Sequence, residues 1–169
     1  MDGLIIVHVG MEFIDHSRYQ NNLTEARIRL IERIAEEARK YINQRDKVYF
    51  LPMVTDGPEA VPPAIRDYYE RMTCIPKPAT YSQYLRTKEQ IIKDRIDQVT
   101  VTGTCHALCV RDMYYLLRGK YYRRASNTEK PEYEKFREKL GWSRRKFNRI
   151  YSAIVNATIN EDLTDKCLH

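Results

Sequence analysis

Apolar and polar residues follow one another along this chain in blocks that predict strands and helices in alternation. Residues 4–9 (LIIVHV) and 48–54 (VYFLPMV) are short, nearly continuous apolar runs, which is typical of strands buried on both faces. The segment between them places apolar side chains at helical spacing and predicts a helix from Asn22 or Thr24 to about Tyr41. The first third of the chain therefore predicts a strand, a helix and a second strand.

The same alternation continues to the end of the chain. The further predicted elements are, in order, a short helix at 64–69, a strand at 72–75, a helix from Tyr81 to about Ile96, a strand at 98–103, a helix from about Cys109, a strand at 120–125, helices at 132–140 and from Ser143 toward Tyr151, and a last strand at 153–158. This order predicts an α/β protein, namely a three-layer α/β/α sandwich with a mostly parallel, Rossmann-like central sheet. No linker interrupts the pattern, so we expect a single domain over residues 1–169 with a polar tail at about 160–169.

Composition and charge narrow the class of protein. Of the 169 residues, 43% are hydrophobic and 31% are charged, which are values of a folded globular chain. The 29 basic and 23 acidic residues give a net charge of +6 but are mixed along the chain, so a nucleic-acid partner is permitted without being required. The first residues show no signal peptide, and no apolar run is long enough to span a membrane. Four irregularly spaced cysteines predict reduced thiols in a cytoplasmic protein.

The segment from Gln98 to Arg118 carries the strongest candidate for chemistry. Alternating valines and threonines predict a strand, Gly103 a sharp turn, and the apolar spacing from Val110 onward a helix. Cys109 therefore falls in the first turn of a helix that follows the carboxyl end of a strand. A thiol ionises more readily at a helix start, and ligands bind at this edge of open parallel sheets. These residues alone also fit the alternative that Cys109 is a small buried apolar residue.

Three segments together resemble the isochorismatase-like cysteine hydrolases, a family that contains nicotinamidases and N-carbamoylsarcosine amidohydrolase. The segments are LIIVHVGMEFID, IPKPATYSQYL and VTVTGTCHALCV, and the resemblance spans roughly residues 3–162. It implies that Cys109 is the nucleophile, that Lys77 is the family's lysine after the third strand, and that a small molecule is the substrate. It also implies a homo-oligomer, since members of this family are commonly oligomers.

The same resemblance assigns further residues to the substrate site. Glu12 and Phe13 stand where the family has an Asp-Phe pair after the first strand, and Tyr81 lies in the helix opening that follows the lysine. The backbone amides of Cys105 and Cys109 are implied to face the substrate carbonyl as an oxyanion hole. The loop between Gly103 and Cys109 differs from the family's usual Ala-Thr-Asp sequence. The oxyanion-hole assignment is the one that this difference affects.

The chain also departs from the family at the catalytic aspartate, where it has His8. A histidine can accept a thiol proton near neutral pH, so an imidazolium–thiolate pair of His8 and Cys109, with Lys77 as a further cation, is consistent with an active hydrolase. Two basic groups beside one thiol also fit a site that holds an acidic ligand without cleaving it. Glu12 is a further candidate for the missing carboxylate.

The chain also lacks residues with which nicotinamidases bind a metal ion. Nicotinamidases bind a metal through an Asp-x-His and another histidine, whereas residues 54–69 keep Asp56 and contain no histidine. Cys105, His106 and Cys109 are rich in metal-binding atoms, but structural zinc needs four ligands, usually from two separated pairs. We therefore expect no metal and no other cofactor.

Two functions follow from these residues. The first is an isochorismatase-like hydrolase that cleaves a C–N bond of a small amide, imide or carbamoyl compound through a thioester on Cys109. The alternative is a catalytically silent protein of the same fold that binds a nucleic acid or a small acidic ligand. Basic and aromatic residues at 118–124 and 143–149 motivate the nucleic-acid version, although a solvated surface explains them more simply.

Overall fold

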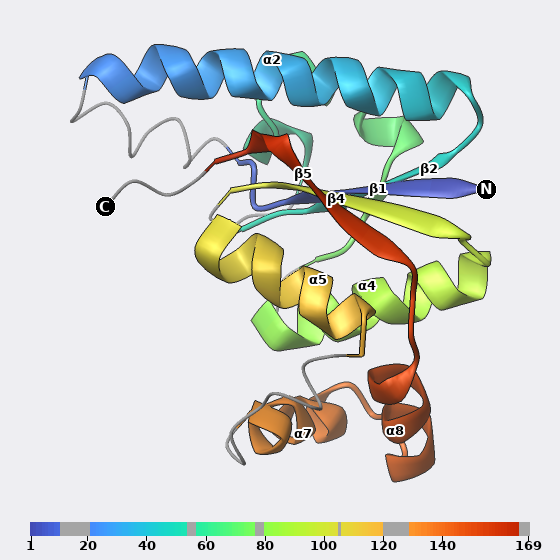
Figure 1. Cartoon of the computed structure of the whole chain (residues 1–169). Coiled ribbons are helices and arrows are strands. Elements are labelled where there is room, and N and C mark those ends of the chain that lie inside the picture. The colour runs from blue at the N-terminus through green and yellow to red at the C-terminus, as the bar shows by residue number, and fades with distance from the viewer. Residues whose placement is uncertain (11–20, 54–56, 77–79, 105, 120–128, 166–169) are drawn as a thin grey trace.

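The computed structural model describes residues 1–10, 21–53, 57–76, 80–104, 106–119 and 129–165. At the centre of these residues lies a five-stranded sheet in the order β3-β2-β1-β4-β5 (Figure 1). The strands are β1 (Asp2–Val7), β2 (Lys47–Leu51), β3 (Thr73–Cys74), β4 (Gln98–Gly103) and β5 (Ala157–Thr164). Each strand is parallel to its neighbours, so all carboxyl ends meet at one edge of the sheet.

Helices of very different length connect the strands. They are α2 (Asn21–Asn43), the short α3 (Pro63–Arg66), α4 (Thr80–Asp94), α5 (Arg111–Leu117), α7 (Glu129–Lys139) and α8 (Arg144–Ser152), with single 3₁₀ turns at Pro58–Ala60 and Tyr69–Arg71. The sequence predicted α2, α4, α7 and α8 close to these bounds, including the break at Gly141. Ser143 caps α8 as expected, since its hydroxyl accepts a hydrogen bond from the Lys146 N–H at 3.2 Å.

The residues of each inner strand alternate between two apolar cores. On β1, Leu4 and Ile6 belong to the core under α2, whereas Ile5 and Val7 belong to the core under α4 and α5. Figure 1 shows α2 above the sheet and α4 and α5 below it, with α7 and α8 farther below. Burial on both faces explains why this strand is a continuous apolar run, and the predicted three-layer α/β/α sandwich is confirmed.

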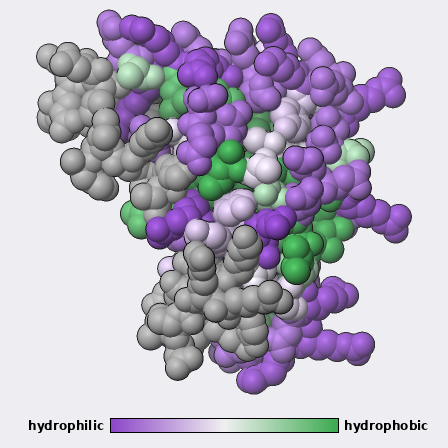
Figure 2. Space-filling model, viewed as in Figure 1, coloured by the Kyte–Doolittle hydropathy of each residue, from purple (hydrophilic) through white to green (hydrophobic). Residues whose placement is uncertain are grey.

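The long helix α2 has one face in the core and one in water. Ile31, Ile34 and Ala38 are buried against the sheet, while the outer surface of α2 is hydrophilic, as the upper part of Figure 2 shows. In the described part of the chain, no helix combines the length and the apolar character that crossing a membrane requires.

The last strand differs most from the prediction. The sequence predicted a strand at 153–158 and a polar tail from about residue 160, whereas β5 runs from 157 to 164. Because β5 is an edge strand, Glu161 and Asp162 can stay exposed while Leu163 and Thr164 are buried. Its polar sequence therefore looked like a tail, and the predicted start of that tail was wrong. The predicted strand at 120–125 lies outside the described residues.

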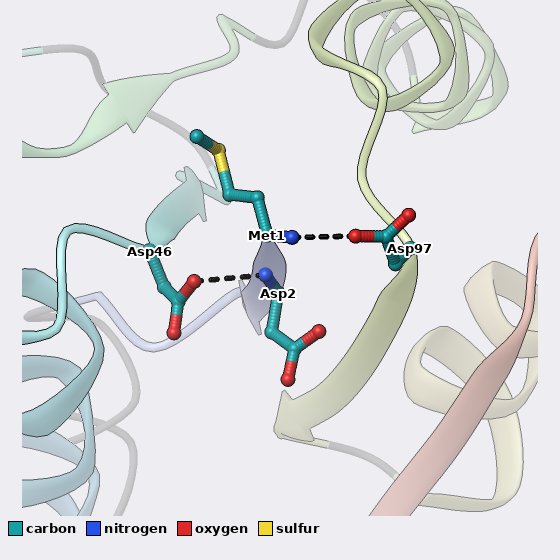
Figure 3. A network of polar contacts seen from close by, with 4 residues as sticks. All are labelled: Met1, Asp2, Asp46 and Asp97. Atoms are coloured by element: carbon teal, nitrogen blue, oxygen red, sulfur yellow. Dashed lines mark hydrogen bonds and ion pairs between the residues drawn. The ribbon is translucent and has the colours of Figure 1, made fainter.

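Exposed polar contacts link separate segments of the chain at the amino-terminal edge of the sheet (Figure 3). The Met1 amino nitrogen lies 2.5 Å from a carboxylate oxygen of Asp97, and the Asp2 backbone N–H donates to Asp46 at 2.8 Å. The hydrogen bond with Asp97 is the main cause that raises the pKa of the Met1 amino group. The Met1 and Asp97 side chains are 45% and 77% exposed, so water screens their attraction.

Candidate active site

The predicted proton acceptor, His8, is the residue directly after β1 at the carboxyl edge of the sheet. Its backbone φ is +55°, a left-handed conformation that few residues other than glycine adopt. The His8 N–H donates to the Leu51 carbonyl at the end of β2 at 2.9 Å, and its side chain is buried, at 3% exposure. Strained backbone of this kind persists where the surroundings determine it strongly, and it is often found at functional sites.

Gln83 of α4 ties His8 to the ends of two further strands. Its amide nitrogen Nε2 donates to the Pro52 carbonyl at 2.9 Å and to the Ile75 carbonyl at 2.8 Å. Its amide oxygen Oε1 lies 3.0 Å from Nε2 of the His8 ring. One buried side chain therefore connects the segments that follow β1, β2 and β3.

The end of β4 comes unusually close to the end of β1. Gly103 has a φ of +132°, and a Cβ atom at this position would lie 2.2 Å from the Val7 carbonyl oxygen. This close approach lets the Thr104 N–H donate to the Val7 carbonyl at 2.9 Å and the Thr104 hydroxyl donate to the His8 carbonyl at 3.2 Å. The glycine predicted as a sharp turn is thus required by the contact between two strand ends.

Cys109, the predicted nucleophile, follows the end of β4 in a π-helical turn at His106–Val110 that leads into α5. Single π turns are rare in proteins as a whole, and those that occur are often found at functional sites. The Cys109 side chain is partly buried and packs against the core under α4 and α5, in which Val110 and Met113 are fully buried. The thiol is therefore held at the carboxyl edge while retaining some access to solvent.

Tyr84 of α4 lies beside both His8 and Cys109. Its ring stacks on the His8 ring with a centroid separation of 6.0 Å and an interplanar angle of 24°. Burial raises the pKa of the Tyr84 phenol strongly, and the Cys109 side chain beside it raises it further. A phenol that stays protonated is a donor for a neighbouring thiolate. Both predicted reactive groups therefore lie beside the same buried side chain.

The structure describes only part of the predicted site. His8 and Cys109 lie at the same edge of the sheet, on segments that follow the neighbouring strands β1 and β4. Tyr81 packs its ring against Tyr133 and Phe136 of α7, with centroid separations of 4.7 and 5.7 Å. Its predicted contact with substrate stays a prediction. The other predicted site residues, which are Lys77, Glu12, Phe13 and Cys105, lie outside the described residues.

The sequence prediction missed three residues that build the site, namely Gln83, Tyr84 and Thr104. Tyr84 lies on the apolar side of the helix predicted from Tyr81 to about Ile96, where its spacing indicates only a core residue. Gln83 gave no signal, because a glutamine inside a helix is usually solvated. A buried position for Gln83, at 0% exposure, becomes evident only when the strand carbonyls it satisfies are in place.

The described residues also bear on the predictions about metal binding and nucleic-acid binding. Among the described side chains, no cluster of three or more His, Cys, Asp or Glu residues could hold a metal ion. The expectation of no cofactor stays a prediction, since Cys105 and the side chain of His106 are not described. In the segment 143–149, the Phe147 ring is fully buried while Arg144 and Arg145 are exposed. Phe147 therefore serves the core and offers no stacking surface for a base.

Comparison with known proteins bears on the fold. The chain matches no protein-family model, and a search of curated proteins finds no match for it either. Among solved structures, the crystal structure of N-carbamoylsarcosine amidase from Thermoplasma acidophilum is similar over 95% of this chain and 96% of that one. The TM-score is 0.55 and the sequence identity is 17%, so the likeness concerns the fold alone. The chain therefore shares the α/β fold of this amidase.

Proposed function

We propose that this protein is a hydrolase that cleaves a C–N bond of a small amide, imide or carbamoyl compound. Cys109 is the nucleophile in this proposal, and His8 accepts its proton. One observation carries it: the His8 ring and the Cys109 side chain, far apart in sequence, both lie beside Tyr84 at the carboxyl edge of the sheet. Ligands of open parallel sheets bind at this edge.

The proposed reaction has two steps. His8 takes the proton from the Cys109 thiol, and the thiolate attacks the carbonyl carbon to form a tetrahedral intermediate. The C–N bond then breaks, the nitrogen leaves with the proton from His8, and a thioester remains on Cys109. A water molecule attacks the thioester, gives its proton to His8 and releases the acid, after which the thiol regains that proton.

Several groups support the charges that develop in these steps. The protonated Tyr84 hydroxyl lies beside Cys109 and favours its thiolate. Lys77 adds a second cation, and the amides of Cys105 and Cys109 act as oxyanion donors, as the family resemblance implies. Glu12, Phe13 and Tyr81 contact the substrate in this proposal.

Selective alkylation tests the reactivity of Cys109. Cys74 is a matched internal control, because both side chains are partly buried and Cys74 packs against the core under α2, on the other face of the sheet from Cys109. Iodoacetamide at neutral pH should modify Cys109 at least about tenfold faster than Cys74, since a stabilised thiolate is the reactive form. Peptide mass spectrometry would measure each rate, and equal modification of all four cysteines would contradict the proposal.

Turnover of a panel of small amides, imides and carbamoyl compounds tests the reaction itself. Cys109→Ser should lower the rate by more than about a thousandfold, whereas Cys74→Ser should leave it near the wild-type value. His8→Asn is the informative variant at His8, because asparagine tolerates the left-handed backbone found there. It should lower the rate by about a hundredfold or more. A panel with no turnover by the wild type would favour the silent binding protein.

A further inference from the structure

We propose that Gln83 is a positioning residue that holds His8 as its Nε2–H tautomer, so that each proton His8 gains or loses passes through Nδ1. The proton route rests on the proposed function, whereas the tautomer does not. Sequence patterns assigned no role to Gln83, and the inference comes from three hydrogen bonds made by one buried side chain.

The first step is the orientation of the Gln83 amide. An amide side chain has one end that donates and one end that accepts, and the two ends look alike in shape. One end of Gln83 lies 2.9 Å from the Pro52 carbonyl oxygen and 2.8 Å from the Ile75 carbonyl oxygen. A carbonyl can only accept, so this end must be the NH₂ group. The reverse orientation would place a third oxygen against these two without a hydrogen between them.

The second step identifies the Gln83 atom that faces His8. With the NH₂ group held by two carbonyls, the atom 3.0 Å from His8 Nε2 is the amide oxygen Oε1. This oxygen can only accept, so Nε2 must carry a hydrogen. The opposite tautomer would set the Nε2 lone pair against Oε1 in a buried place, where unpaired polar contacts are costly.

The third step concerns the other ring nitrogen. A neutral imidazole carries one ring proton, and in His8 that proton is at Nε2. Nδ1 therefore accepts the proton that the thiol releases, and the same atom returns it to the leaving nitrogen. A half-turn of the ring would place the carbon Cε1 where Nε2 now meets Gln83 and would break this contact. The His8 backbone is held as well, since its N–H donates to Leu51 and its carbonyl accepts from Thr104.

This arrangement differs from a histidine supported by a carboxylate. A carboxylate at the second nitrogen orients the ring and also stabilises the imidazolium, whereas a neutral amide mainly orients it. Gln83 thus determines which nitrogen is basic while adding no negative charge.

Nitrogen NMR of histidine-labelled Cys109→Ser protein at pH 8 tests the tautomer directly, because this variant has no thiolate that would hold a second proton on the His8 ring. His8→Asn identifies the His8 signals by their loss. We expect the Nδ1 shift of an unprotonated nitrogen and an Nε2–H whose exchange with water is slowed by about tenfold or more relative to a solvent-exposed histidine. An Nδ1–H tautomer in the Cys109→Ser protein would overturn the inference, and this measurement requires no variant of Gln83.

Gln83→Met tests whether Gln83 is the cause, since methionine keeps the approximate volume and removes all three hydrogen bonds. Gln90→Met is the matched control, because Gln90 lies on the same helix and bonds Asp94, away from His8. Gln83→Met should lose the slow exchange of the His8 Nε2–H and lower kcat by about ten- to a hundredfold with a smaller change in KM. Gln90→Met should change neither. Equal protection of the Nε2–H in both variants would refute the role of Gln83.

The hydrolase proposal and the proposed role of Gln83 can be contradicted independently of each other. An Nε2–H tautomer in a protein that hydrolyses none of the amides supports the role of Gln83 and contradicts the hydrolase. Hydrolysis by a protein whose His8 is the Nδ1–H tautomer supports the hydrolase and contradicts the role of Gln83.

Discussion

The two edges of the sheet are held together in opposite ways. At the amino edge, Met1 and Asp97 form an ion pair that is largely exposed to water. At the carboxyl edge, the buried Gln83 side chain donates to two backbone carbonyls at 2.8 and 2.9 Å, and its amide oxygen lies 3.0 Å from Nε2 of the buried His8 ring. The contact between Met1 and Asp97 joins full charges that water screens, whereas the contacts of Gln83 with the two carbonyls join uncharged groups that are buried.

The comparison shows which edge of the sheet allows fewer alternative arrangements of its side chains. Exposed charges can separate at little cost, because water replaces each partner. Buried polar groups cannot lose a partner without leaving an unsatisfied atom, so the carboxyl edge tolerates few alternatives. The left-handed backbone at His8 and the crowding at Gly103 lie at this same edge. Rigid positioning of this kind is what a reacting pair of side chains requires.

The largest expected effect comes from adding one methyl group at Gly103. In Gly103→Ala the new Cβ would lie 2.2 Å from the Val7 carbonyl oxygen in a left-handed backbone, so the two strand ends must separate. We expect a loss of at least about 3 kcal/mol in the free energy of unfolding, measured by urea denaturation. Gly141→Ala is the control, since its φ is +68° and no atom lies within 4 Å of the new Cβ. It should cost only about 1 kcal/mol. Equal losses would mean that strand crowding is unimportant.

An intermediate effect is expected at Lys88, a second buried polar side chain of α4. Its ammonium donates to the Leu116 carbonyl at 2.5 Å and to the Tyr151 carbonyl at 2.9 Å, and burial lowers its pKa from 10.5 to about 7. Between these values the unfolded chain holds a proton that the folded protein releases. The free energy of unfolding therefore rises with pH across this window, by at most about 1.4 kcal/mol per pH unit.

Replacing Lys88 with methionine should remove this pH dependence. The difference in unfolding free energy, wild type minus Lys88→Met, should increase by about 2 kcal/mol between pH 7 and pH 9. Urea denaturation of both proteins at matched pH values measures it, and the subtraction cancels groups that titrate alike in both. A difference that stays constant with pH would show that Lys88 keeps its proton in the folded protein.

The smallest effects compare one polar contact from each edge. Thr104→Val removes the hydroxyl that donates to the His8 carbonyl and should cost about 1 kcal/mol, because the contact is buried. Asp97→Asn removes the charge that faces the Met1 amino group and should leave the urea midpoint unchanged within error, both in low salt and in 0.5 M salt (about a 4 Å screening length). A larger loss for Asp97→Asn than for Thr104→Val would reverse the contrast between the edges.

Much of the fold could be predicted from the sequence, because strand and helix patterns report burial directly. The run LIIVHV predicted β1 since both of its faces are apolar, and the Ser143 cap predicted the start of α8. The edge strand β5 was misplaced because half of it faces water and follows no apolar pattern. Lys88 stood on the apolar side of the predicted helix, but nothing in the pattern revealed the two carbonyls that receive its ammonium.

The amino-acid sequence by itself determined the alternation of strands and helices and the place of Cys109 after a strand and a glycine, because local spacing and backbone freedom depend on near neighbours. Tertiary structure alone decided that Gln83 contacts the segments that follow three strands and that Tyr84 lies beside both His8 and Cys109. The physical reason is that a hydrogen bond between residues 75 positions apart leaves no periodic trace in the chain. Such a contact exists only once the sheet has brought its carboxyl ends together.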